Sequence, residues 1–106
     1  MPEFVIALTT CPIKSGVELA RSLVEKRLCA CINIIPKVTS IYHWKEKLVV
    51  DDEALLLMKT ERRHIQLLWE AVKELHPYEV PEYVVLSIVW GSQDYLNWIL
   101  QNIVVQ

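Results

Sequence analysis

Glycine is scarce in this sequence, and the motifs of the common enzyme classes are absent. Only two of the 106 residues are glycine, so no glycine-rich loop is present to cradle a phosphate group. No serine, cysteine and histidine stand in a nucleophile motif, and no two carboxylates have the spacing of a catalytic pair. These absences argue against an enzyme, and we expect a non-enzymatic protein.

The sequence also lacks an excess of basic residues and a long apolar run. Eleven lysines and arginines against 13 acidic residues give a net charge of −2, which disfavours a nucleic-acid or anionic-membrane partner. Apolar runs such as residues 83–89 are far shorter than the roughly 20 residues that a membrane-spanning helix needs. The N-terminus carries no basic stretch typical of a secretion signal, so we expect a cytoplasmic protein.

Cysteine occurs in an odd number, which leaves one thiol unpaired in any intramolecular scheme. Cys11, Cys29 and Cys31 therefore fit a reducing compartment better than an oxidising one. A Cys-x-Cys pair without a second pair of ligands is not a structural zinc pattern. The simplest interpretation is that each cysteine is a small buried apolar residue.

The pattern of apolar residues predicts the order βαββαβ followed by a third helix. Strands are expected at residues 4–9, 31–35, 48–60 and 83–90, and helices at 15–28, 61–75 and 92–102. Residues 38–44 stay extended and form a long hairpin with the returning strand. We expect a single domain over residues 1–106, of the α+β class, with a ferredoxin-like antiparallel sheet and both main helices on one face.

Several residues predict where these elements begin and bend. Ser15 and Glu18 have the spacing of a capping box, and Thr60 is a candidate cap for the second helix. Pro36 has no N–H to donate, so it belongs at an edge or a bulge. The Asp51-Asp52 pair predicts a bulge in the returning strand.

Two helices cannot cover both faces of the predicted sheet. Residues 55–58 and 83–86 are apolar in continuous runs, whereas a strand with one solvated face alternates between apolar and polar residues. The uncovered face therefore predicts contact between copies of the chain around a symmetry axis.

Histidine and cysteine side chains are candidate ligands for a borderline metal such as copper or zinc. His76 and Cys11 both fall just outside the predicted elements. His76 also suits the C-terminal end of a helix stopped by Pro77, and this interpretation stays open beside that of a ligand. His64, in the first turn of a helix, is expected to face solvent.

Charged residues gather near the proline-flanked segment 76–82. Lys59 ends the third predicted strand, and Glu79 and Glu82 surround the start of the fourth. Loops at sheet ends commonly carry binding sites, and a rigid loop holds its side chains well. Simple ion pairs are the alternative, so the segment is either a stiff connector or a functional site.

Five stretches together resemble the CutA family of divalent-cation tolerance proteins. They are ACINIIP (30–36), VTSIYHW (38–44), LLLMKT (55–60), HPYEVPE (76–82) and YLNWI (95–99). The match covers almost the whole chain in order. The resemblance implies a compact homotrimer of ferredoxin-like subunits, similar in architecture to the PII-type signalling proteins.

The resemblance also implies a role in tolerance of divalent cations, chiefly copper. It attributes ion binding to the histidine of the His-Pro-Tyr block and to a cysteine near the end of the first strand, here His76 and Cys11. Glu79 or Glu82 would support the ion at a subunit boundary. No organic cofactor is implied.

A second hypothesis is a PII-like regulatory or adaptor trimer that binds a small anionic ligand or a protein partner in clefts between subunits. The residues expected to line such a cleft are Tyr42, Trp44, Lys59, Tyr78, Glu79 and Glu82. A third hypothesis is a stable scaffold without a ligand.

Overall fold

Four antiparallel strands form one sheet in the order β2-β3-β1-β4. The structure is a computed structural model and describes residues 2–104. The elements are β1 (Phe4–Cys11), α1 (Gly16–Glu25), β2 (Cys31–Trp44), β3 (Lys47–Glu61), α2 (Ile65–Leu75), β4 (Val84–Ser87) and α3 (Gln93–Gln101). Short 3-10 turns precede α1 and α2. The predicted ferredoxin-like order and the third helix are confirmed.

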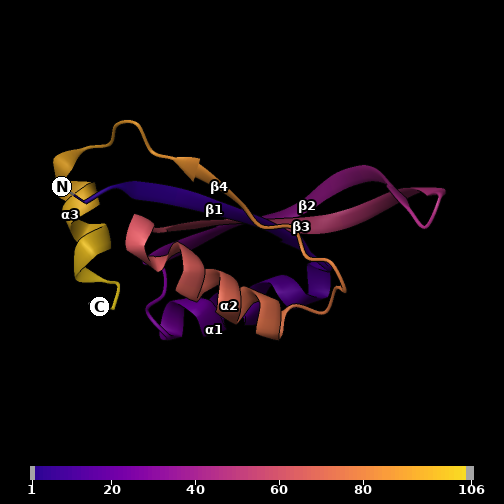
Figure 1. The fold of residues 1–106 in the computed structure, drawn as a ribbon, viewed down its shortest axis with the longest axis horizontal. Helices are drawn as coiled ribbons and strands as arrows, with labels where there is room; N and C mark the ends of the chain where they lie inside the picture. The colour runs from indigo at the N-terminus through magenta and orange to yellow at the C-terminus, as the bar shows by residue number, and fades with distance from the viewer. Residues whose placement is uncertain (1, 105–106) are drawn as a thin grey trace.

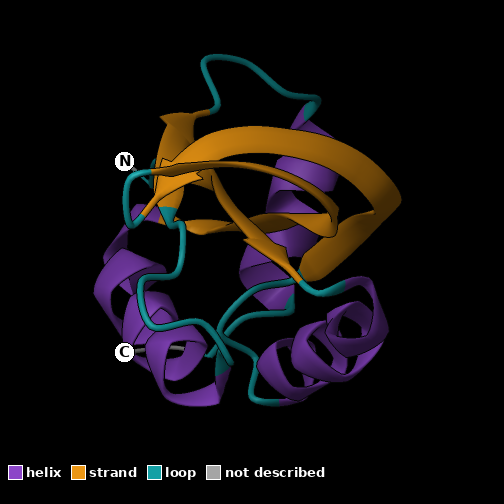
Figure 2. Ribbon diagram, turned by 90° about the vertical axis from the view of Figure 1, so that its right-hand side faces the viewer, coloured by secondary structure: helices purple, strands orange, loops and turns teal. Residues whose placement is uncertain are grey.

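The helices α1 and α2 lie side by side on one face of the sheet (Figure 1). Figure 2 shows the same two-layer arrangement from the end of the hairpin. The β2–β3 hairpin projects beyond the helices, whereas α3 lies at the opposite end of the sheet (Figure 1). The hairpin makes the molecule elongated, with extents of 45 × 25 × 21 Å. No helix within residues 2–104 has the length and apolar character to cross a membrane.

The main core lies between α1, α2 and the face of the sheet that they cover, which we call the helix face. Leu56 and Met58 of β3 are fully buried there with Ala7 of β1, which pairs with Met58. Leu23 of α1 and Leu68 of α2 pack against them. Burying each large apolar side chain stabilises the folded chain by roughly 1.5–3 kcal/mol. Because the chain's own helices bury these residues, this face is closed within one chain.

The other face of the sheet, which we call the open face, is also apolar. Strand register places on it Ile6, Leu8, Ile35, Leu55, Leu57, Val84 and Leu86. Leu86, for example, is 51% exposed in the single chain. The continuous apolar runs in the sequence therefore arise because both faces of the strands are apolar.

The caps of the first two helices differ from the prediction. Ser15 belongs to a 3-10 turn with helical backbone angles, and its side chain makes no capping hydrogen bond. Thr60 lies within β3, where its hydroxyl donates to the carbonyl oxygen of Leu28 at 2.8 Å. Glu61 caps the 3-10 turn that precedes α2, because its carboxylate accepts a hydrogen bond from the Arg63 N–H. The capping-box and Thr60 predictions are wrong because 3-10 turns start both helices.

The irregularity of the hairpin lies in β2. The register shifts between residues 35 and 38, so Pro36 occupies a bulge on an outer strand, as predicted. Residues 51–52 pair regularly with residues 39–40, and the bulge predicted there is wrong. A proline without an N–H interrupts a strand pairing, whereas an aspartate pair on an exposed hairpin does not.

Two strand ends also differ from the prediction. β1 continues to Cys11, which therefore lies inside a strand. β4 ends at Ser87, and the apolar run beyond it leaves the sheet, where the side chain of Trp90 is 82% exposed. Residues 88–90 are thus apolar without being part of a strand.

His64 is buried, so the prediction that it faces solvent is wrong. Its Nε2 contacts the carbonyl oxygen of Val104, and the Val104 N–H donates to the Arg27 carbonyl oxygen at 2.8 Å. The chain after α3 therefore returns over the start of α2 and covers the imidazole.

Candidate functional site

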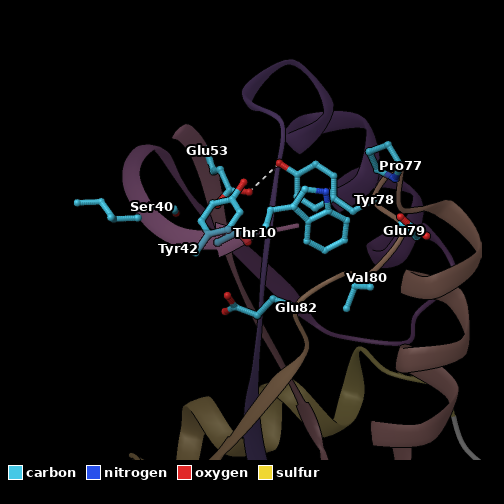
Figure 3. Close-up of a pocket in the computed structure, with 11 residues that line it drawn as sticks. Thr10, Ser40, Tyr42, Glu53, Pro77, Tyr78, Glu79, Val80 and Glu82 are labelled. Carbon is cyan, nitrogen blue, oxygen red and sulfur yellow. Dashed lines mark hydrogen bonds between the residues drawn. The ribbon is translucent and has the colours of Figure 1, made fainter. Parts of the chain in front are cut away.

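A cavity of about 680 Å³ lies between the β2–β3 hairpin, the end of β1 and the segment after α2 (Figure 3). It is lined by Thr10, Ser40, Ile41, Tyr42, Trp44, Glu53, Pro77, Tyr78, Glu79, Val80 and Glu82. Five of the six residues predicted to line a cleft are in this set, namely Tyr42, Trp44, Tyr78, Glu79 and Glu82. The structure thus joins the hairpin and the proline-flanked segment at one site.

Glu53 is a buried carboxylate of this cavity that the sequence analysis did not identify. It is only 4% exposed, and its Oε2 accepts a hydrogen bond of 2.7 Å from the Tyr78 hydroxyl. Figure 3 shows the hydroxyl directed at the carboxylate, with the Tyr42 ring beside the pair. The alternation of side chains along β3 could have identified it, because Glu53 is an acidic residue on the same face of the strand as the apolar open-face residues.

Burial and the charge of Glu53 both raise the pKa of the acidic groups around it. Burial raises the pKa of the Tyr78 hydroxyl, and the hydrogen bond to Glu53 raises it further. Burial, followed by the Glu53 charge, raises the pKa of the Glu82 carboxyl. The pKa of Tyr42 is raised by desolvation and then by Asp51 and Glu53. The charge of Glu53 therefore adds to the effect of burial on the neighbouring acidic groups.

Among the residues that the structure describes, no lysine or arginine lines the cavity. Within residues 2–104, Glu53, Glu79 and Glu82 make no ion pair. Lys59, the sixth predicted residue, is six positions from Glu53 along β3, a separation of roughly 20 Å. Its Nζ donates to the Tyr95 hydroxyl at 3.3 Å and lies 5.5 Å from the centroid of that ring. Lys59 therefore belongs to the α3 end of the sheet and not to this cavity.

His76 connects α2 to β1 beside the cavity. It is the C-cap residue of α2, since its N–H donates to the Val72 carbonyl oxygen at 2.8 Å. Its Nε2 lies 2.7 Å from the Thr10 carbonyl oxygen, and its Nδ1 accepts from the Tyr78 N–H at 3.1 Å. Because a carbonyl oxygen only accepts, Nε2 carries the proton. Both ring nitrogens are thus occupied, and the imidazole fixes the backbone that positions Tyr78.

Cys11 lies on the helix face and is fully buried in the main core. Burial, and secondly the charge of Glu53, raises the pKa of its thiol. In the part of the chain that the structure describes, no three histidine, cysteine, aspartate or glutamate side chains are placed to hold a metal ion together. Metal binding by His76 and Cys11 therefore stays a prediction.

Relatives with similar sequences are found in bacteria and animals. The family model described as "CutA1 divalent ion tolerance protein" matches residues 5–102. The divalent-cation tolerance protein CutA of Thermus thermophilus is 46% identical over 94% of this chain and 97% of its own length. Protein CutA of Mus musculus is 47% identical over 90% of this chain, which spans about half (54%) of that relative.

Solved structures of such proteins share this fold. The divalent cation tolerance protein from Thermus thermophilus has a TM-score of 0.88 and 46% identity, over 97% of this chain and 99% of that chain. A PII-like protein CutA from Nostoc has a TM-score of 0.84 and 38% identity, over 93% of each chain. Sequence and fold therefore agree with the resemblance seen in the sequence, and the chain belongs to the CutA1 family of divalent ion tolerance proteins.

Proposed function

We propose that this chain is a non-enzymatic protein that binds divalent cations, with copper as the first candidate, and thereby contributes to cation tolerance. The buried carboxylate of Glu53 is the observation that carries this proposal. A buried charge is unfavourable unless it is paired or bound to an ion, and no cation of the described chain pairs with Glu53. A bound cation would supply the missing countercharge.

The ligands proposed for this ion differ in how readily they become available. Glu53, Glu79 and Glu82 are the carboxylate residues that line the cavity. His76 becomes a ligand only when its Nδ1 gives up the Tyr78 N–H or its Nε2 loses its proton. Cys11 binds a metal as a thiolate, which its raised pKa opposes. We therefore propose the carboxylates, rather than the predicted pair of His76 and Cys11, as the first ligands, although within residues 2–104 no three such side chains are placed to hold an ion together.

We also propose that the functional unit is a homotrimer, as the family resemblance implies. The support is the amount of apolar surface that the single chain leaves exposed. Besides the open face, the hairpin carries Ile41, Leu48 and Val50 with about two thirds of each side chain exposed. Contiguous apolar surface of this kind is unusual on a monomer and marks contact sites.

The alternative of a PII-like trimer with a small anionic ligand is weaker. Of the described residues, three glutamates and no lysine or arginine line the cavity. An anion would therefore enter a negative potential without a charged partner.

Calorimetric titration with Cu(II), and with Cu(I) under reducing conditions, tests the cation proposal. Wild-type protein should bind, and Glu53→Gln should weaken binding at least about tenfold because it removes the buried charge. Glu74→Gln is the matched control, since it removes an exposed carboxylate of α2 that does not line the cavity. The absence of binding heat in the wild type, or equal affinity in Glu53→Gln, would contradict the proposal.

His76→Ala is the second variant for this titration. Equal copper affinity in the wild type and in His76→Ala would remove His76 from the site. A loss of affinity would support a rearranged site that includes the imidazole, provided that circular dichroism shows an intact fold.

A further inference from the structure

The walls of the cavity are aromatic as well as acidic. Tyr42, Trp44 and Tyr78 line it together with Glu53. The Tyr78 ring is held from two sides, because its hydroxyl donates to Glu53 and the His76 ring lies 4.8 Å away between centroids. Tyr42 and Trp44 are partly exposed, so their rings are accessible to a ligand.

We propose that this cavity binds a primary alkylammonium group, with the ammonium against Glu53 and the alkyl chain along the aromatic rings. The inference rests on the proposed function only in assigning a cation to this cavity. The faces of tyrosine and tryptophan rings attract organic cations, and the same rings offer apolar area to an alkyl chain. A carboxylate accepts the N–H donors of the ammonium.

One oxygen of Glu53 is free to accept such a donor. Oε2 accepts from the Tyr78 hydroxyl, whereas Oε1 accepts no hydrogen bond within residues 2–104. Oε1 is not fully buried, so it is accessible to a ligand. A nearly buried carboxylate with one accessible oxygen and no positive neighbour fits a ligand that brings both charge and N–H donors.

The size and the lining of the cavity suit an organic cation as well as the metal ion of the proposed function. A volume of about 680 Å³ lies within the roughly 300–1,000 Å³ of small-molecule sites. Three aromatic rings contribute to binding of an alkylammonium group but provide no ligands for a metal ion.

The lysines of the same chain do not supply this ammonium group. No lysine lines the cavity, and Lys45 instead lies over the Trp44 ring with its Nζ 5.9 Å from the centroid. The ammonium therefore comes from outside the chain. It belongs either to a free amine or to a lysine that a second copy presents. We take Lys45 and Lys47 as the candidate lysines, because both are exposed and lie at the tip of the hairpin that projects beyond the helices.

Calorimetric titration of metal-free protein with 1,4-diaminobutane, in the presence of a chelator, tests the inference. Wild-type protein should bind the diamine and should give no binding heat with 1,4-butanediol, which has the same chain length without charge. Glu53→Gln should lower the affinity at least about tenfold, and Trp44→Leu by a smaller factor. Glu74→Gln should bind like the wild type, and circular dichroism should show that each variant is folded.

A Lys45→Gln, Lys47→Gln double variant distinguishes the two sources of the ammonium. If the natural ligand is a free amine, the diamine binds the wild type and the double variant alike. If a lysine of a second copy fills the cavity, the diamine competes with that lysine and binds the double variant more tightly than the wild type. The inference is overturned if the diamine binds neither protein, or if Glu53→Gln binds it as well as the wild type does.

The copper titration separates this inference from the metal proposal. Copper binding without diamine binding would overturn the alkylammonium site alone. Diamine binding without copper binding would overturn the metal part of the proposed function and leave the alkylammonium site supported.

Discussion

The two faces of the sheet are built from the same strands but depend on different partners. On the helix face, Leu56 and Met58 are fully buried by the chain's own helices. On the open face, Leu86 is half exposed, and Glu53 is buried beside the cavity and makes no ion pair within residues 2–104. The helix face is thus complete within one chain, whereas the open face carries apolar surface and charge that call for a partner outside it.

Matched leucine substitutions on the two faces should give the largest difference. Leu56→Ala removes a fully buried side chain and should lower the free energy of unfolding by about 2–5 kcal/mol. Leu86→Ala should lower it by less than half of that in the single chain, because half of the side chain is already exposed. Urea unfolding at several protein concentrations measures both.

The same experiment tests what covers Leu86. Its substitution should weaken assembly, so that the unfolding midpoint of Leu86→Ala depends less on protein concentration than that of Leu56→Ala. Equal losses of stability at every concentration would break the comparison between the faces.

Glu53→Gln should stabilise the cation-free protein by about 1 kcal/mol, since it removes a buried charge and keeps an acceptor for the Tyr78 hydroxyl. Thermal unfolding with a chelator present measures the change, and the exposed Glu74→Gln should leave the midpoint unaltered. A lower midpoint for Glu53→Gln would mean that the chain itself compensates the charge.

The reactivity of the three thiols should also differ between the two faces of the sheet, and this test has the smallest expected effect on the protein. Cys11 and Cys29 are fully buried, whereas Cys31 pairs with Lys59 on the open face and is half-buried. A thiol reagent should therefore modify Cys31 first and the other two only after unfolding in urea. Cys31→Ser should remove the fast phase, and equal rates for all three thiols would contradict the assignment of faces.

The buried thiol of Cys29 also makes the free energy of unfolding depend on pH. Burial, and secondly the neighbouring Cys31, raises its pKa from 9.0 to about 12. The folded chain therefore holds this proton more tightly than the unfolded chain, so the contribution of Cys29 to stability is present below pH 9 and is lost as pH rises toward 12. Cys29→Ala should flatten that part of a stability curve measured by urea unfolding.

Much of the fold and part of the site could be predicted from the sequence, because they depend on local patterns. Periodicity gave the order of strands and helices, and the continuous apolar runs indicated the open face. The proline-flanked segment and the hairpin aromatics located Tyr42, Trp44 and Tyr78 at the cavity. These features depend on spacing within single elements.

Contacts between distant parts of the chain account for most of what the sequence did not show. Glu53 is buried partly by Tyr78, 25 residues further on, and His64 is covered by Val104, 40 residues further on. Lys59 follows Glu53 closely in the sequence, yet an extended strand carries it to the far end of the sheet. Each of these positions depends on how β3, α2 and the C-terminal segment pack together.

Multi-angle light scattering on the wild-type protein tests most directly whether the open face is covered by copies of the chain. One chain has a mass of 12.4 kDa. We predict a single species of about three times that mass, or about 37 kDa. A stable species of 12.4 kDa at micromolar concentration would show that the open face remains exposed, and would contradict the account.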